Sequence, residues 1–255
     1  DHDSSWPGLA YIAYFSEGHA ADLPSIRVHF VGGTVNGYLT LDMTDEQMHR
    51  LTASAPSRFI DVVSRKVHAV WTSAGMHDFC KADDGKSPGY RQYMGILDSL
   101  MTWQQQLVGM EKYGRIPRNR SLLYVNFTFG SLYQDGLGIS AHIDLERPLL
   151  NCRSLRFKDS ETIWGLAHEW GHQHQLQPYF CWGGVSEVTN NLNAYYSLMR
   201  MGYQYKDLEE GKRWGLEHAV EQYIDGETDD CIFQQNEAHE NAFEQLCPFL
   251  KLCHY

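Results

Sequence analysis

The chain has 255 residues, which is enough for one substantial domain with a hydrophobic core of its own. Hydrophobic residues make up 43% and charged residues 21%, a composition typical of a folded globular protein and not of a disordered one. The formal net charge is -11, so nucleic acid or an anionic membrane surface would meet a repulsive field. No segment reaches the roughly 18 apolar residues of a membrane span. We therefore expect neither nucleic-acid binding nor a transmembrane segment.

Strands are predicted mainly in the first half of the chain. Short apolar or alternating runs are separated there by glycine and proline, which is the pattern of strands joined by turns. The expected strands are residues 9–15, 26–33, 35–41, 67–73 and 121–130.

Helices are predicted between these strands and throughout the second half. Thr44 and Gln47 have the spacing of a capping box, which marks the start of a helix. The remaining helical segments are residues 56–66, 91–113, 159–177, 186–201, 207–225 and 234–250. Strands that lead into a helix-rich half predict an α+β architecture, with residues 1–43 as a β-rich leading segment.

Six cysteines are present, and no two of them have the Cys-x-x-Cys spacing of a thiolate metal site. They are Cys80, Cys152, Cys181, Cys231, Cys247 and Cys253. Buried thiols and disulfides of an exported protein fit this spacing equally well. The cysteines therefore leave the cellular compartment open.

The segment "HEWGHQHQ", residues 168–175, lies on the predicted helix 159–177. A helix turns about 100° per residue, so His168 and His172 lie within roughly 40° of each other and about 6 Å apart along the axis. Both imidazoles can reach one metal ion. Glu169 points away from His168 by about 100°, which suits a general base for a metal-bound water better than a ligand.

The alternative interpretation is a pair of ordinary core or surface histidines. The apolar residues Ile163, Leu166, Ala167 and Trp170 cluster within roughly 100° on one side of the helix, and the two histidines project almost opposite. Core histidines would share the apolar face, so this pattern disfavours a core role. A solvated polar face stays open as an explanation.

A zinc hydrolase needs a third protein ligand and an open position for water, and Glu187 is the candidate. Ser186 is placed to cap a new helix, with Glu187 in its first turn. A glutamate at that position is otherwise a favourable partner of the helix dipole. Asn190 and Asn191 share a helix face with Glu187 and are candidates for orienting it, whereas ordinary surface polarity is the alternative.

These residues carry a resemblance to a known family. "WGLAHEWGHQHQ" followed by "EVTNN" resembles the signature of the enhancin-like, mucin-degrading zinc metallopeptidases, the peptidase family M-sixty. The segments "VHFVGGTVNGYLTL" and "YMGILDSLMTWQQQLVGM" are similar to parts that precede the zinc site in that family, so the resemblance spans about four-fifths of the chain. In relatives a His-Gly-Tyr run often precedes the zinc helix, whereas this chain reads "GISAHIDLERP", with His142 in that place.

The resemblance implies a zincin-like catalytic fold of the gluzincin type over residues 1–255, with the catalytic part at 44–255. It implies an endopeptidase that cuts O-glycosylated, mucin-like proteins and that is secreted, periplasmic or at the cell surface. It makes His168, His172 and Glu187 the Zn²⁺ ligands and Glu169 the general base.

Zinc lowers the pKa of a bound water toward about 7, and Glu169 is expected to take the water proton and pass it to the leaving amine. A further hydrogen-bond donor is needed to stabilise the oxyanion, and the sequence does not rank the candidates, which are His142, Tyr179, Tyr195 and Tyr196. Trp182 is a candidate for stacking on a sugar, with packing in a loop as the alternative.

Three other functions stay open at this point. The first is a zinc peptidase with no glycan requirement. The second is a non-catalytic interaction protein, which the intact Glu169 disfavours because a binding module gains nothing from a general base. The third is a glycan-binding module with structural zinc, which normally has four protein ligands.

Overall fold

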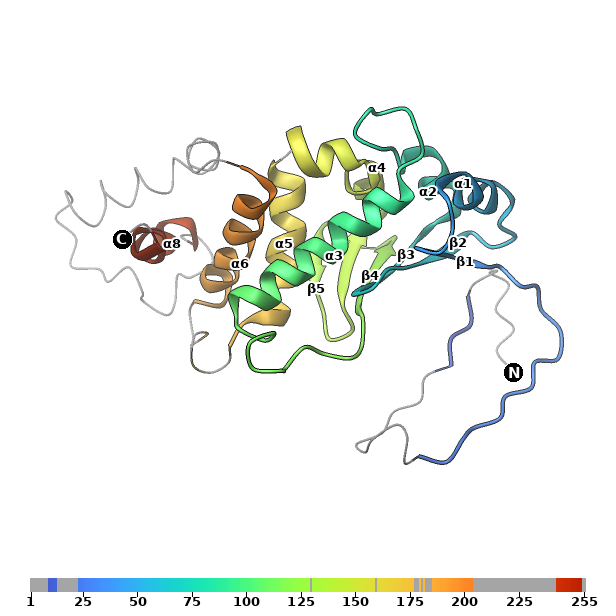
Figure 1. Cartoon of the computed structure of the whole chain (residues 1–255), viewed down its shortest axis with the longest axis horizontal. Coiled ribbons are helices and arrows are strands. Elements are labelled where there is room, and N and C mark those ends of the chain that lie inside the picture. Colours follow the sequence, from blue (N-terminus) through green and yellow to red (C-terminus); the bar gives the residue numbers. More distant parts are fainter. Residues whose placement is uncertain are drawn as a thin grey trace.

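A six-stranded mixed sheet, with helices packed on one of its faces, organises the first half of the chain (Figure 1). The computed structural model describes residues 9–12, 23–128, 130–158, 160–176, 179, 181, 185–203 and 242–253. The strand order is β1-β2-β3-β4-β6-β5. The strands are β1 Tyr38–Thr40, β2 Phe59–Val63, β3 Val67–Thr72, β4 Ser121–Asn126, β5 Leu132–Gln134 and β6 Ile139–His142.

The sheet mixes parallel and antiparallel pairs. β2 and β3 form an antiparallel hairpin with Ile60 opposite Trp71, and β3, β4 and β6 continue in parallel. β5 returns antiparallel to β6 at the edge of the sheet, where Tyr133 pairs with Ser140. This edge strand is the one that reaches the candidate site described below.

Side chains alternate between the two faces of the sheet, as the pleat requires. Ile60, Ala69 and Leu123 are fully buried on the face that meets the helices. Their strand neighbours on the other face are only partly buried.

The helices are α1 Asp45–Ser54, α2 Ser73–Phe79, α3 Tyr90–Leu107, α4 Glu146–Leu150, α5 Ser160–His174, α6 Ser186–Met201 and α8 Ala242–Cys253. Short 3₁₀ and π segments, η2 Ile143–Leu145 and η3 Ser154–Lys158, flank α4. The capping box predicted at the start of α1 is confirmed, because Thr44 Oγ1 accepts from Gln47 N and Gln47 Oε1 accepts from Thr44 N.

Helix α3 crosses the sheet and buries an apolar stripe against it (Figure 1). Tyr93, Leu97 and Leu100 are buried at intervals of three and four residues, which is the period of a helix. Tyr93 also accepts a hydrogen bond of 2.8 Å from Trp71 Nε1, so the polar ends of two buried aromatic side chains satisfy each other.

Helices α5 and α6 lie side by side and in close contact (Figure 1). Gly171 allows this closeness, because a Cβ added there would lie 2.6 Å from the backbone oxygen of Asn190. The predicted apolar face of α5 is confirmed, since Ile163, Leu166, Ala167 and Trp170 are all fully buried.

The α+β architecture is confirmed, but several predicted elements are wrong. The described residues of 9–15 and the whole of 26–33 form no strand, and side chains such as Val31, 92% exposed, find no partner layer. A strand forms only where another strand satisfies its backbone groups, and alternation alone does not provide that. The predicted β-rich leading segment therefore holds only β1 among its described residues.

The segment 56–66, predicted as helix, contains strand β2 instead. Ile60 and Val62 are buried alternately, and pairing with both β1 and β3 overrides the local helical pattern. The predicted helix 207–225 lies outside the described residues, and α8 confirms the part of 234–250 that is described.

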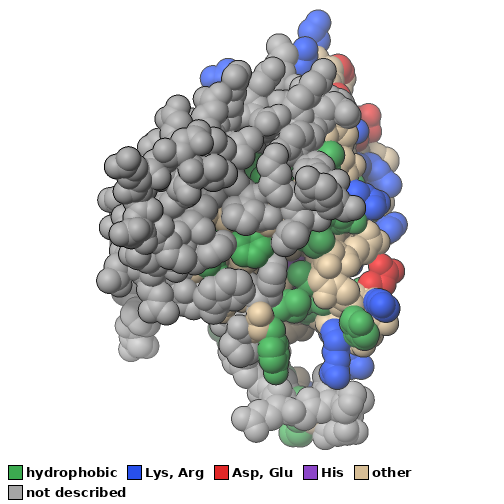
Figure 2. All heavy atoms as spheres, turned by 90° about the vertical axis from the view of Figure 1, so that its left-hand side faces the viewer, with side chains coloured by type: hydrophobic (Ala, Val, Ile, Leu, Met, Phe, Trp, Pro, Cys, Tyr) green, Lys and Arg blue, Asp and Glu red, His purple; other side chains and the backbone are tan. Residues whose placement is uncertain are grey.

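Figure 2 views the molecule from the α8 end of Figure 1, where hydrophobic side chains are visible beside an edge on which Lys and Arg side chains alternate with Asp and Glu. Across the described ranges, none of the helices combines the length and the apolar character that a membrane crossing requires.

Candidate metal centre

The two histidines of α5 project from the side opposite its buried face and lie next to each other. Their rings have centroids 5.0 Å apart and are nearly perpendicular. The side chains of His168 and His172 are 19% and 17% exposed, so they are reachable from solvent yet largely surrounded by protein.

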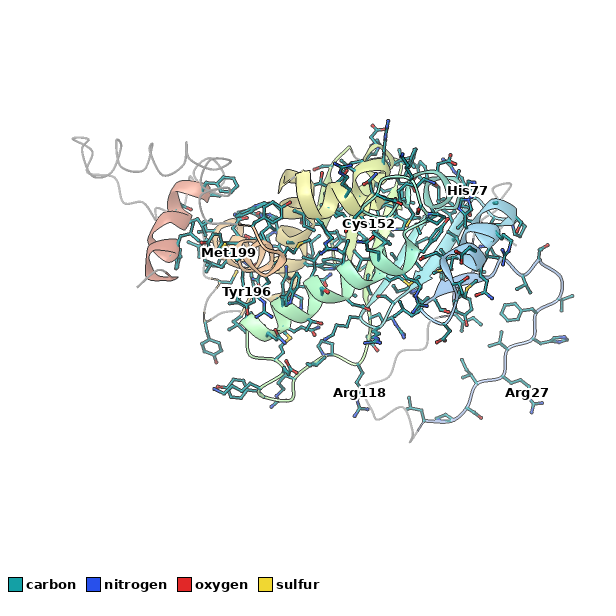
Figure 3. All side chains as sticks on the ribbon, turned by 45° about the horizontal axis from the view of Figure 1, so that its top comes forward. Arg27, His77, Arg118, Cys152, Tyr196 and Met199 are labelled. Carbon is teal, nitrogen blue, oxygen red and sulfur yellow. The ribbon has the colours of Figure 1, made fainter. Side chains whose placement is uncertain are left out.

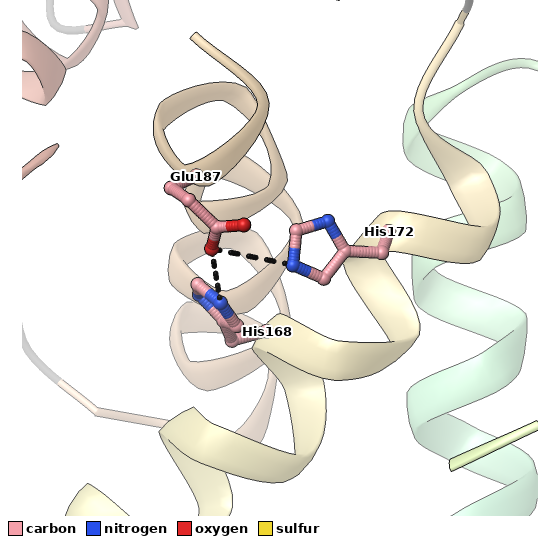
Figure 4. Close-up of side chains that lie close together, drawn as sticks. All are labelled: His168, His172 and Glu187. Atoms are coloured by element: carbon pink, nitrogen blue, oxygen red, sulfur yellow. Dashed lines mark hydrogen bonds and ion pairs between the residues drawn. The ribbon is translucent and has the colours of Figure 1, made fainter. Parts of the chain in front are cut away.

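Glu187 approaches both imidazoles from the first turn of α6 (Figure 4). Its Oε2 lies 3.2 Å from His168 Nε2 and 3.4 Å from His172 Nε2. Three ligands about 2.1 Å from a tetrahedral zinc ion are separated from one another by about 3.4 Å. Two imidazole nitrogens and one carboxylate oxygen, all within 4.8 Å of one another, can hold a zinc ion, and they form the one cluster of three or more metal-ligating side chains within the described ranges.

The charges of the three groups are coupled. Hydrogen bonds with His168 and His172 hold the pKa of Glu187 far below its usual range. Burial alone would lower the pKa of His172, but the hydrogen bond and negative charge of Glu187 raise it above its ordinary value. Glu187 therefore stays ionised, which is the form of a carboxylate that binds a divalent cation.

Glu169 lies beside this cluster but is not one of its three converging side chains. Its Oε1 is 3.9 Å from His168 Nε2, and its Oε2 accepts a hydrogen bond of 2.7 Å from Gln134 N on the edge strand β5. Burial raises the pKa of Glu169, although the neighbouring histidines and the hydrogen bond from Gln134 oppose the shift. A carboxylate with a raised pKa is suited to take up and release a proton near neutral pH.

Asn191 fixes the orientation of His168. Its Oδ1 accepts from His168 Nδ1 at 2.7 Å and from Trp164 Nε1 at 3.0 Å, and its Nδ2 donates to the backbone oxygen of Glu187 at 2.7 Å. An Nδ1–H donated to a buried acceptor leaves Nε2 free to bind a metal. The sequence predicted that Asn191 orients Glu187, and the contact with His168 is an additional one.

Asn190 lies between the two histidines. Its Nδ2 is 2.9 Å from the Nε2 atom of both His168 and His172, and the residue is fully buried. The sequence placed Asn190 on the same face as Glu187 but did not predict that its amide reaches the point where the imidazoles converge.

Three contacts around the cluster were not predicted from the sequence. Gln175 Oε1 accepts from His172 Nδ1 at 3.2 Å, and the same side chain donates to Thr189 Oγ1. Gln104 of α3 donates to the backbone oxygen of Ala167 at 2.7 Å, directly before His168. The spacing of three residues between His172 and Gln175 was a usable signal, whereas the contact from Gln104 crosses 63 positions and had none.

The remaining candidates that the structure describes are not among the converging side chains of the cluster. His142 pairs with Asp144, at 3.2 Å between Nδ1 and Oδ2. Tyr179 is 88% exposed, and Trp182 lies outside the described residues. Tyr195 and Tyr196 line a separate, largely apolar cavity of about 630 Å³ together with Met199, and Figure 3 shows Tyr196 and Met199 on α6.

A cavity of about 390 Å³ opens directly beside the cluster. It is lined by Tyr133, Gln134, Glu169, His172, Gln175, Ser186 and Glu187. Glu169 and the edge strand therefore face the same space as His172 and Glu187. None of the four predicted oxyanion donors lines it.

A mixed sheet backed by helices, with two histidines and a glutamate on adjacent helices and a second glutamate beside them, defines a metallopeptidase-type centre. The family model of Peptidase M60, enhancin and enhancin-like, matches residues 42–255. The chain therefore belongs to this family, as the resemblance in its motifs predicted.

Solved structures of similar fold include a metallopeptidase from Bacteroides thetaiotaomicron, with 20% identity, a TM-score of 0.58, and coverage of 68% of this chain and 28% of that one. A metallopeptidase in complex with Tn antigen has 20% identity and a TM-score of 0.58, over 68% of this chain and 31% of that one. ZmpB metallopeptidase from Clostridium perfringens has 15% identity and a TM-score of 0.59, over 84% of this chain and 43% of that one.

At these identities the likeness concerns the fold. The chain spans less than half the length of each of these solved chains. No curated protein matches the sequence.

Proposed function

We propose that this protein is a zinc-dependent endopeptidase that hydrolyses peptide bonds in O-glycosylated, mucin-like proteins. The observation that carries the proposal is the convergence of His168, His172 and Glu187 beside the half-buried Glu169. Membership of a metallopeptidase family supports the peptidase activity. The fold shared with a metallopeptidase in complex with Tn antigen supports a glycoprotein substrate.

In this proposal the two Nε2 atoms and the Glu187 carboxylate hold the metal. Zinc supplies a Lewis acid that polarises the scissile carbonyl and acidifies a water molecule. Glu169 takes the proton of the attacking water and returns it to the leaving amine, and its hydrogen bond from Gln134 N holds the carboxylate in place. Asn191 keeps His168 in the tautomer that ligates through Nε2.

Residues 1–255 act as one catalytic region in this proposal, with the catalytic part at 44–255. Export to the periplasm, the cell surface or the medium is inferred from the substrate class. Trp182 is proposed to contact the glycan, and Trp182→Ala is expected to reduce cleavage of glycosylated substrate more than that of bare peptide. Equal losses on both substrates would show that Trp182 has a packing role.

Cleavage of an O-glycosylated mucin and of its deglycosylated form tests the activity and its glycan requirement together. We expect the wild type to cut only the glycosylated form. Glu169→Gln is expected to lose roughly 10²- to 10⁴-fold in kcat while keeping its zinc, because it removes proton transfer and leaves the ligands intact. Zinc content is measured on both proteins by elemental analysis.

Glu111→Gln is the matched control, since Glu111 is exposed and far from α5 in sequence. It should retain full activity and full zinc content. Equal cleavage of the bare and glycosylated forms would identify a zinc peptidase without a glycan requirement. Zinc bound without any cleavage would identify a binding protein on this fold.

A further inference from the structure

The side chain of Asn190 occupies an unusual position. Its Nδ2 lies 2.9 Å from His168 Nε2 and 2.9 Å from His172 Nε2, and the residue has no exposed surface. Its Oδ1 is buried without a hydrogen-bond partner. A buried amide with one end shared by two metal-ligating nitrogens and the other end unsatisfied needs an explanation, because an unmet buried acceptor costs about 1–3 kcal/mol.

The hydrogen bonds on the outer sides of the two rings determine what faces Asn190. His168 Nδ1 donates to Asn191 Oδ1, and His172 Nδ1 donates to Gln175 Oε1. Both Nε2 atoms face one point, where Glu187 Oε2 also lies, 3.2 Å from His168 Nε2 and 3.4 Å from His172 Nε2. The two N–H bonds of the Asn190 amide supply positive charge there, where the proposed metal ion would otherwise supply it.

We propose that Asn190 is a fourth metal-directed group of this site. Without metal, its NH₂ group lies within hydrogen-bond distance of both Nε2 atoms. With metal, a half-turn of the amide presents Oδ1 to the ion, because a cation attracts the carbonyl end and repels the NH₂ end. The terminal torsion of Asn is roughly two-fold, so the half-turn stays within nearly the same volume.

This inference rests on the proposed metal at His168, His172 and Glu187. It adds a neutral oxygen to that set, and four-coordinate zinc sites can expand to five ligands. It also explains why a buried amide, and not an apolar side chain, stands at this point of the α5–α6 interface.

The test compares Asn190→Ala, Asn190→Asp and the wild type in metal affinity, measured by competition of Zn²⁺ and Co²⁺ with a chromophoric chelator. Asn190→Ala is expected to bind zinc at least about tenfold more weakly, the usual loss when a group that supports a metal site is removed. Asn190→Asp is expected to bind zinc more tightly, because a carboxylate replaces the neutral oxygen at nearly the same shape. The d–d spectrum of bound Co²⁺ should differ from that of the wild type in both variants.

Asn193→Ala provides the matched control. Asn193 lies on the same helix, is 4% exposed and also has an Oδ1 without a partner, but it lines the apolar cavity near Tyr195 and not the metal cluster. This variant should match the wild type in affinity and spectrum.

Several outcomes separate the possibilities. If Asn190→Ala and Asn190→Asp bind both metals with wild-type affinity and give the wild-type cobalt spectrum, the role of Asn190 is overturned. If Asn190→Ala fails to fold, the near-isosteric Asn190→Asp decides the question by the same two measurements. If the wild type itself binds neither metal, the proposed zinc site fails, which is a different result.

Discussion

The core between the sheet and α3 and the interface between α5 and α6 are both buried, but they are built differently. The first is packed with apolar and aromatic side chains such as Ile60, Leu97 and Leu123. The second contains buried polar side chains of α6 that hydrogen-bond to α5 or to Gln175 just after it, namely Thr189, Asn190 and Asn191. Apolar packing at the second interface would be simpler and would avoid the cost of desolvating amides.

The difference shows what each interface determines. The sheet core supplies stability and holds the edge strand in place, and many apolar residues of suitable volume would serve there. The α5–α6 interface fixes the orientation of two imidazoles through hydrogen bonds with defined donors and acceptors, which only polar side chains provide. Variants that affect one interface and leave the other intact therefore test this division.

The largest expected effect on stability is in the sheet core. Leu123→Ala on β4 removes a fully buried side chain and should lower the free energy of unfolding by about 2–5 kcal/mol, through lost burial and the cavity left behind. Chemical denaturation measures this loss. The zinc affinity of the folded protein should stay at the wild-type value, and a parallel fall in affinity would show that the two regions are not separable.

The buried His174 at the end of α5 should make stability depend on pH. Burial lowers its pKa from the ordinary 6.5 to about 4, although its hydrogen bond to the backbone oxygen of Trp170 opposes the shift. Between pH 6.5 and 4 the unfolded chain binds a proton that the folded chain does not. Stability is therefore complete above pH 6.5 and falls as the pH drops toward 4, by about 3 kcal/mol in total.

Thermal unfolding over this pH range, with a chelator present so that metal binding does not contribute, measures the effect. His174→Asn should show a shallower dependence, since Asn does not titrate. An unchanged slope in this variant would assign the pH dependence to other groups.

A smaller effect is expected at the contact between α5 and α6. Gly171→Ala places a Cβ 2.6 Å from the backbone oxygen of Asn190, so the helices must separate slightly. Overpacking of this kind costs about 1–3 kcal/mol, and the shift of Asn190 and Glu187 should also weaken zinc binding. Calorimetry measures the loss of stability, and chelator competition measures the loss of zinc affinity.

Gly165→Ala on the same helix is the matched control and has the smallest expected effect. Its Cβ would meet only Leu132 Cδ2 at 3.4 Å, which is an ordinary contact. It should stabilise the protein by up to about 1 kcal/mol, because alanine is the better helix former, and should leave zinc affinity unchanged. Equal behaviour of the two variants would refute a special role for the closeness at Gly171.

The sequence by itself determined what depends on neighbours along the chain. The spacing of His168 and His172, the opposite apolar face of α5 and the capping box at Thr44 all lie within single helices, where a fixed turn per residue sets which side chains meet. The family was also predicted from a short run of residues, and the family model confirmed it.

Only the tertiary structure decided what depends on distant partners. Strand β2 replaced a predicted helix because β1 and β3 pair with it, and residues 26–33 formed no strand because no strand in the described part of the chain pairs with them. Contact between distant elements also produces the hydrogen bond from Gln134 to Glu169 and places the amide of Asn190 between two imidazoles. Hydrogen bonds between elements depend on the distance at which those elements pack, and local sequence patterns do not predict that distance.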